Sequence, residues 1–215
     1  MPSTPSPRVS GQVPQLARAV EVMDQLRSPG GCPWDAEQTH RSLAQYLLEE
    51  AYEVLEAIES DDPDLLREEL GDLLLQVLFH ARLAEEEESP YSIEDVAGDL
   101  ADKLIRRHPH VFASAERGDA ATLNETWERQ KIVEKGRTSA TDGVPLAQPS
   151  LAFAAKLVSR VQRAGLAVAA PSGDDIGARL FAIVTEAVAA GVDPEGALRR
   201  TTRDYRDAIL AAERS

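Results

Sequence analysis

The feature that most constrains this chain is a pair of amphipathic segments between Leu47 and Phe79, separated by a short polar turn. With about 100° between successive residues of a helix, the first segment has its apolar residues on one face and its acidic residues on the other. The turn Asp61-Asp62-Pro63 is typical of a break followed by the first residue of a new helix. After Asp72 the second segment is apolar on nearly all sides, which indicates a helix covered by protein on most of its faces. The acidic strip of the first segment comprises Glu49, Glu50, Glu53 and Glu56, and in the second segment Glu69 and Asp72 share one face.

Helix stability does not explain these carboxylates, because like charges three or four residues apart cost roughly 0.2–0.5 kcal/mol per pair. A carboxylate on a covered helix needs a partner, since burying it unpaired costs on the order of several kcal/mol or forces it to take up a proton. Arg67 precedes Asp72 by five residues and points elsewhere, while Glu69 shares the face of Asp72 and adds repulsion. A hard divalent cation, bound by oxygen atoms from both helices, removes the conflict.

We therefore predict a magnesium site, with Mn²⁺ as an alternative ion. Its predicted ligands share an i, i+3 spacing on each helix, which lets both members of a pair reach one ion: Glu50, Glu53, Glu69 and Asp72. Glu49 lies on the same strip and is predicted to hold or deprotonate an attacking water, but spacing alone leaves it open as a further ligand. Glu56 is predicted either to be solvated or to lie in the layer of residues around the ligands, without binding the ion itself. Because Mg²⁺ commonly bridges carboxylates and substrate phosphates, the predicted substrate is a polyphosphate such as a nucleotide.

The acidic pattern runs Glu49-Glu50-x-x-Glu53, a spacer of fifteen residues, then Glu69-x-x-Asp72. Further segments accompany it in order: Gly31-Cys32-Pro33-Trp34-Asp35-Ala36-Glu37-Gln38-Thr39-His40, then Glu69-Leu70-Gly71-Asp72-Leu73-Leu74, then Asp102-Lys103-Leu104-Ile105-Arg106-Arg107-His108-Pro109-His110-Val111-Phe112. Together these segments resemble the signature of the MazG family, the all-α nucleoside triphosphate pyrophosphohydrolases. The resemblance extends from about residue 14 to the C-terminus.

The resemblance implies an all-α, MazG-like helical bundle whose four-helix core is completed by dimerisation. It also implies hydrolysis between the α and β phosphates of a nucleoside triphosphate, giving a monophosphate and pyrophosphate, as house-cleaning of the nucleotide pool. In this family a Lys and an Arg four residues apart match Lys103 and Arg107, and a later Trp and Lys match Trp127 and Lys131, all as substrate contacts. Two helices alone make a thin pair that needs further helices to cover it, so we predict a homodimer.

The chain is expected to divide into four parts. Residues 1–13, rich in Pro and Ser, are predicted to be a disordered tail, and residues 14–135 to form the catalytic helical domain. Residues 136–150 are predicted to be a flexible loop, serving as a lid or a hinge. Residues 151–215 are predicted to be C-terminal helices that pack on or extend the same domain.

Several local features accompany this division. Predicted helices span 37–59, 64–88 and 92–107, and the acidic run from Glu85 to Glu88 is expected to be a fraying, solvated end. Trp34 is predicted to be a packing anchor, and Thr39 or Asp35 to cap the helix that follows. His108 and His110 lack helical metal-ligand spacing, so capping or hydrogen bonding is predicted for them.

The amino-acid composition limits which binding partners and which cellular compartment are expected for this chain. The 215 residues include 37 acidic and 23 basic ones, a net charge of −14, which argues against nucleic acid as the main partner because phosphate tracks need a basic footprint. The single cysteine, Cys32, excludes an intramolecular disulfide. The sequence has neither a long apolar run nor a recognisable leader, so we predict no membrane span and a cytoplasmic protein.

Two other functions fit parts of the pattern. A related all-α pyrophosphohydrolase with a narrower substrate, such as dUTP, dCTP or a phosphoribosyl nucleotide, would share the acidic signature. A non-catalytic helical module would use its acidic strip as a solvated face that docks on a basic partner. Specific magnesium binding and release of pyrophosphate distinguish the enzymes from the module.

Overall fold

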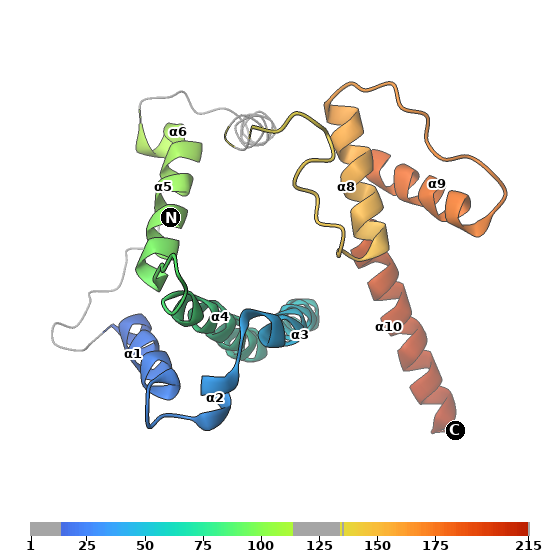
Figure 1. Ribbon diagram of the computed structural model, residues 1–215. Helices are drawn as coiled ribbons and strands as arrows, with labels where there is room; N and C mark the ends of the chain where they lie inside the picture. Colours follow the sequence, from blue (N-terminus) through green and yellow to red (C-terminus); the bar gives the residue numbers. More distant parts are fainter. Residues whose placement is uncertain (1–13, 114–133, 135, 215) are drawn as a thin grey trace. The chain divides into compact units, whose positions relative to one another are not determined.

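The computed structural model describes residues 14–113, 134 and 136–214. Every regular element in these residues is an α-helix, and none of them is a strand, which confirms the all-α prediction. The same residues contain no helix that is both long and apolar enough to span a membrane. The chain divides into two compact units, Met1–Arg117 and Gly118–Ser215 (Figure 1). Trp127 and Lys131 lie outside the described residues.

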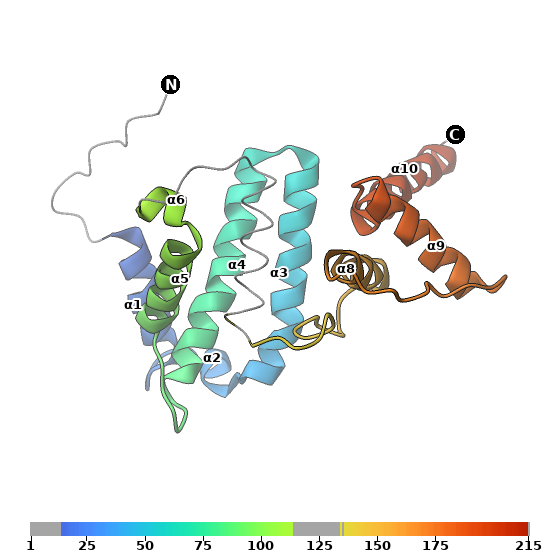
Figure 2. The same ribbon diagram turned by 90° about the horizontal axis from the view of Figure 1, so that it is seen from above.

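The first unit is organised around two long neighbouring helices, α3 (His40–Ser60) and α4 (Pro63–Ala84), which lie side by side (Figure 2). The helix α1 (Gln15–Arg27) packs on α4 and on the short α2 (Pro33–Glu37). The helix α5 (Ile93–Arg107) also packs on α4 and is followed by the short α6 (Pro109–Phe112). The pair α3–α4 therefore forms the scaffold on which the acidic residues are carried.

Side-chain caps define where α3 and α4 begin. The Thr39 side chain accepts a hydrogen bond from the Ser42 amide, and the Ser42 hydroxyl accepts one from the Thr39 amide, which confirms Thr39 as the cap of α3. Asp61 ends α3 in the left-handed region at φ 56°, and the Asp62 side chain caps the first amides of α4. This two-residue turn reverses the chain and sets the two helices antiparallel.

The core of the first unit lies where α1, α3 and α4 meet. It consists of Met23, Leu43, Leu78, Phe79 and Leu83. The Trp34 ring packs edge-on against Tyr46 and Phe79, at centroid distances of 6.0 and 6.4 Å, in agreement with a packing role, but 49% of its surface stays exposed. Removing these apolar side chains from water is the main favourable term for the unit.

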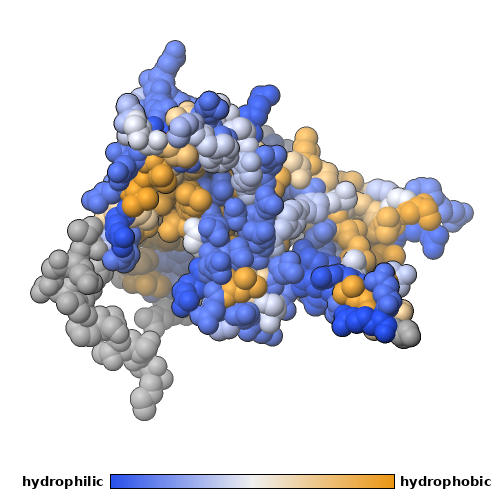
Figure 3. All heavy atoms as spheres, turned by 90° about the horizontal axis from the view of Figure 1, so that it is seen from below, coloured by the Kyte–Doolittle hydropathy of each residue, from blue (hydrophilic) through white to orange (hydrophobic). Residues whose placement is uncertain are grey.

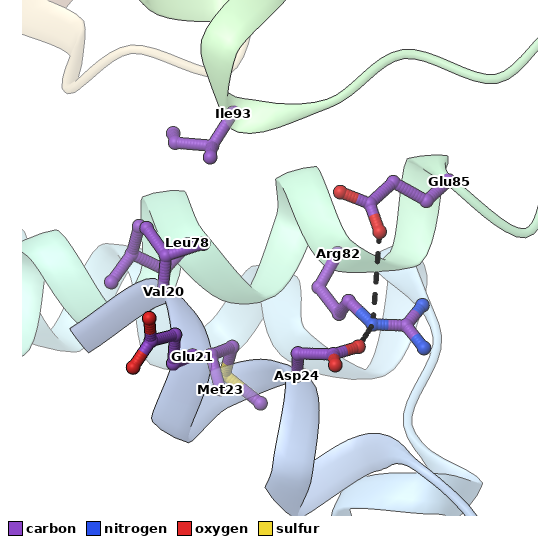
Figure 4. Close-up of a pocket in the computed structure, with 8 residues that line it drawn as sticks. All are labelled: Val20, Glu21, Met23, Asp24, Leu78, Arg82, Glu85 and Ile93. Carbon is purple, nitrogen blue, oxygen red and sulfur yellow. Dashed lines mark hydrogen bonds and ion pairs between the residues drawn. The ribbon is translucent and has the colours of Figure 1, made fainter. Parts of the chain in front are cut away.

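The acidic run after α4 differs from the prediction, because the helix ends at Ala84 and three of the four glutamates have partners. Arg82 contacts Glu85 at 3.8 Å and Glu86 at 2.9 Å, and Arg27 of α1 contacts Glu86 at 2.9 Å. Figure 4 shows Arg82 between Asp24 and Glu85, beside a cavity of about 250 Å³ between α1, α4 and the start of α5. The run is therefore part of a charged network. One of the cations in this network comes from α1, which is distant in the sequence.

The outer face of α4 also differs from the prediction that most of this helix is covered. Four of its side chains expose between 38% and 49% of their surface: Leu70, Leu74, Leu75 and Val77. The reason is that α1, α3 and α5 contact α4 over only part of its circumference. Figure 3 shows apolar patches at the surface among hydrophilic residues.

The described helices of the second unit are α8 (Ser150–Arg163), α9 (Ile176–Ala189) and α10 (Pro194–Glu213), and each contacts the other two. Val184 of α9 is 1% exposed and lies in the core of this unit. Ahead of α8, the Asp142 carboxylate accepts hydrogen bonds from the amides of Thr138 and Ser139, and Arg160 of α8 donates to the carbonyls of Ala140 and Asp142. The predicted flexibility of residues 136–150, like the predicted domain boundaries, stays a prediction.

Candidate metal centre

Three of the predicted ligands meet between α3 and α4. Glu50 of α3 and Glu69 and Asp72 of α4 each offer a carboxylate oxygen, and these oxygens lie within 4.8 Å of one another. All three side chains are half-buried. The i, i+3 spacing on α4 places Glu69 and Asp72 on one face, and the short turn between the helices brings Glu50 opposite them.

Within the described residues, no ion pair joins a cationic side chain to the three clustered carboxylates. Burial raises the pKa of Glu50, and the neighbouring charges of Asp72 and Glu53, a hydrogen bond with Glu53 and the charge of Glu49 raise it further. Burial also raises the pKa of Glu69, followed by the charges of Glu53, Asp72 and Glu68.

The nearby cation on α4, Arg67, pairs with Asp64 at 3.1 Å in an exposed position. A group of oxygen donors that mutually disfavour their charged forms is the chemistry that a hard divalent cation relieves. The residues present therefore fit a magnesium or manganese ion.

The other acidic residues of the strip lie around this group. Glu53 is exposed on α3 and close enough to both Glu50 and Glu69 to influence their pKa values, but it is not one of the three residues whose oxygens meet. Glu49 is exposed and acts on Glu50 through its charge, and Glu56 is exposed one turn farther along α3. The fourth ligand and the general base therefore stay predictions.

The predicted substrate residues lie on a different helix or outside the described residues. Lys103 and Arg107 are half-buried and four residues apart on α5, which packs on α4. In the described part of the chain, no ion pair joins Lys103 to the three carboxylates. His108 Nδ1 lies 2.7 Å from the Leu104 carbonyl at the end of α5, in agreement with a capping role.

Sequence reasoning missed a buried amide beside the cluster. Gln76 is 4% exposed and lies one turn beyond Asp72 on the same face of α4. Its Oε1 has no hydrogen-bond partner within the described residues. The signal in the sequence was a single polar residue, four positions after Asp72, inside a run of Leu and Val.

Comparison with known proteins places this region in a family. Residues 38–112 match the model described as the MazG nucleotide pyrophosphohydrolase domain, a range that contains the three clustered carboxylates together with Lys103 and Arg107. A Thermotoga maritima protein named nucleoside triphosphate pyrophosphohydrolase/pyrophosphatase MazG is 39% identical over 211 residues, covering 86% of this chain and 80% of the relative.

Two further relatives extend the match. A Mycobacterium tuberculosis nucleoside triphosphate pyrophosphohydrolase is 46% identical over 205 residues, which cover 94% of this chain but only 59% of that protein. An uncharacterised 26.1 kDa protein of Streptomyces cacaoi is 52% identical over 202 residues, covering 93% of this chain and 83% of the relative. The similarity therefore includes both units of the chain.

Proposed function

The chain belongs to the MazG nucleotide pyrophosphohydrolase family, and from this membership we propose that it hydrolyses nucleoside triphosphates to monophosphates and pyrophosphate in a magnesium-dependent reaction. The observation that carries the proposal is the meeting of Glu50, Glu69 and Asp72 between α3 and α4, inside the matched region. The names of the Thermotoga and Mycobacterium relatives support the same reaction. House-cleaning of the cytoplasmic nucleotide pool is the role that we propose for it.

Glu50, Glu69 and Asp72, with Glu53 as the fourth predicted ligand, would hold the ion. An all-oxygen donor set suits Mg²⁺ or Mn²⁺ better than softer metals. When bound, the ion offsets the charge of the substrate phosphates and makes a water more acidic. The four carboxylates would thus determine the affinity for the ion. The ion would in turn determine where the triphosphate is bound.

The remaining predicted residues act on the substrate and on the attacking water. Glu49 orients a water molecule and accepts its proton as the bond between the α and β phosphates breaks. Lys103 and Arg107 bind phosphate oxygens from α5, and Trp127 and Lys131 supply further substrate contacts. Because no covalent nucleophile is needed, direct attack by water is the simplest reaction that these side chains support.

The test of this function is Asp72→Asn, which removes one charged ligand while keeping the size of a half-buried side chain. We expect pyrophosphate release to fall by about 100-fold or more and magnesium binding, measured by calorimetry, to weaken in parallel, with unchanged circular dichroism. The control is Glu94→Gln, an exposed acid on α5 that is outside the cluster. Turnover and magnesium affinity close to wild type in Asp72→Asn would remove this residue from the mechanism.

The substrate is tested with a panel of canonical and non-canonical ribo- and deoxyribonucleoside triphosphates, with release of pyrophosphate as the readout. Broad activity supports a house-cleaning role. Activity confined to dUTP, dCTP or a phosphoribosyl nucleotide supports the narrower enzyme. No release with any nucleotide and no specific magnesium binding support the docking module.

We also propose that two copies form a homodimer. An apolar groove of about 420 Å³ runs between α1 and α4, lined among others by Val22, Leu26, Leu74 and Leu75. Apolar patches that remain exposed on a helix of a small unit are typical of an interface. Sedimentation at micromolar concentration is expected to give twice the mass of the 23.3 kDa chain, and a monomeric mass contradicts the proposal.

A further inference from the structure

Outside the metal centre, three polar side chains form a row where the start of α3 meets the last turns of α4. The Nδ1 atoms of His40 and His80 lie 2.6 Å apart, and the two rings are nearly parallel, at 6° and a centroid distance of 4.9 Å. On the other side of His40, its Nε2 lies 3.3 Å from a carboxylate oxygen of Glu87. The row is therefore Glu87, His40, His80, in which His40 bridges the other two.

The contacts determine which nitrogens carry hydrogen. An ionised carboxylate only accepts, so the Glu87 oxygen favours a hydrogen on His40 Nε2 and leaves His40 Nδ1 as an acceptor in the neutral ring. Two nitrogens at 2.6 Å require one hydrogen between them, so it must sit on His80 Nδ1. His80 Nε2 is then the bare nitrogen, and it is buried without a hydrogen-bond partner in the described residues.

We propose that Glu87, His40 and His80 form an acid-sensitive clasp, in which Glu87 selects the tautomer of His80 through His40 and one hydrogen joins α3 to α4. The clasp requires that only one of the two facing nitrogens carries hydrogen. When both imidazoles are protonated, two N–H groups face each other and the contact is lost. Since α3 and α4 also carry the three clustered carboxylates, the clasp fixes the relative position of the helices that hold them.

The row does not converge on a metal ion. His40 uses its two nitrogens for two different partners, so its contacts point in opposite directions across the ring. Among the described residues, the one group of three or more ligand atoms within 4.8 Å of each other is Glu50, Glu69 and Asp72. A hydrogen-bonded row is therefore the arrangement that the geometry supports.

The sign of the pH response follows from His80. Burial lowers the pKa of His80 from 6.5, and the charge of His40 lowers it further. Between that lowered pKa and 6.5 the unfolded chain binds a proton that the folded chain does not, so the fold loses stability as the pH falls through this window.

Apart from Glu87, no charged side chain in the described residues has a hydrogen bond or ion pair with His40 or His80. Arg27 and Asp24 of α1 bind Glu86 and Arg82, and Asp95 of α5 binds its own cap, Ser92. Asp35 and Glu37 of α2 make no hydrogen bond or ion pair with either imidazole. Glu87 is therefore the charge that acts directly on the pair.

The first experiment reads the tautomers of the four histidines by long-range ¹H–¹⁵N spectra of the full chain at about pH 8, assigned with His40→Asn and His80→Asn. We expect His40 with hydrogen on Nε2 and His80 with hydrogen on Nδ1. Glu87→Gln changes the side chain that pairs with His40 Nε2. It is expected to add the form of His80 that carries hydrogen on Nε2. The control Glu88→Gln removes a neighbouring exposed charge and is expected to leave the spectrum unchanged. Hydrogen on Nε2 in both wild-type rings, or an unchanged His80 in Glu87→Gln, overturns the proposal.

The second experiment measures the urea midpoint of the wild-type chain and of His80→Asn between about pH 8 and pH 5. The Asn amide can donate to His40 Nδ1 in place of His80 Nδ1–H, but it does not titrate. We expect the wild-type midpoint to fall toward acid, and that fall to shrink by about half or more in the variant. Equal pH dependence in the two proteins overturns the acid sensitivity of the clasp, even where the tautomers are as expected.

Discussion

The two units of the chain differ sharply in charge. Residues 1–117 contain 24 acidic and 10 basic residues, whereas residues 118–215 contain thirteen of each. The whole net charge of −14 therefore belongs to the first unit, which also carries the clustered carboxylates. A net charge averaged over the chain therefore describes neither unit. The excess of acidic residues, which disfavours binding to nucleic acid, belongs to the first unit.

The units also use arginine in different ways. In the first unit, Arg27 and Arg82 pair with carboxylates at 2.8–2.9 Å. In the second unit, Arg160 and Arg163 donate to backbone carbonyls before and within α8. Ion pairs weaken with salt and acid, but hydrogen bonds to neutral carbonyls do so much less. The stability of the first unit should therefore include a part that depends on pH and salt, whereas the two hydrogen bonds from Arg160 to backbone carbonyls should depend on them little.

The strongest test of this separation is a pair of core truncations. Leu43 and Val184 are each 1% exposed, one in each unit. Leu43→Ala is expected to cost about 2–5 kcal/mol of stability and to lower the denaturant concentration at which magnesium binding is lost. Val184→Ala is expected to cost about 2 kcal/mol in unfolding of the second unit while leaving magnesium affinity unchanged. Calorimetric magnesium titrations and urea unfolding provide the readouts, and a matching loss of affinity in both variants would show that the units are one cooperative body.

A smaller effect is expected from Arg160→Met, which keeps the apolar stem and removes the donors. The carbonyls of Ala140 and Asp142 lose their donor, so we expect a cost of about 1–2 kcal/mol in the second unit. Because these acceptors are neutral, the part of the cost that comes from these two hydrogen bonds should be the same in low and high salt. Arg179→Met, at an exposed position on α9, is the control. A cost that disappears at about 1 M salt would show that Arg160 acts as an ion-pair partner.

What could be predicted from the sequence was local. The carboxylates of α3 and α4 were found because i, i+3 spacing and a two-residue turn fix which side chains meet. The contacts of Glu86 with Arg27 and of His80 with His40 were missed because these partners lie 59 and 40 residues away in the chain, beyond any helical period. The exposed side of α4 was missed because apolar composition indicates that a face should be covered, but not which element covers it.

The smallest expected effect is that of acid on the first unit through Glu86. A hydrogen bond from Arg27 lowers the pKa of Glu86 from 4.5, burial opposes this, and the charges of Arg27 and Arg82 lower it further. Because the folded pKa lies below the unfolded one, the contribution of Glu86 is complete above about pH 4.5 and is lost as the pH falls through the lowered value. The side chain is 44% exposed, so solvent screening limits this contribution to less than about 1 kcal/mol.

Glu86→Gln is therefore expected to be slightly less stable than the wild-type chain at neutral pH, with the difference shrinking toward acid and at about 1 M salt. Urea midpoints of the first unit measure this difference. They are followed through loss of magnesium binding at neutral pH and by circular dichroism in acid. The exposed neighbour Glu88, changed to Gln, is the matched control and should match wild type at every pH. A difference that stays constant into acid would mean that Glu86 acts through packing and not through its charge, and the first unit would lose its clearest example of a stabilising ion pair.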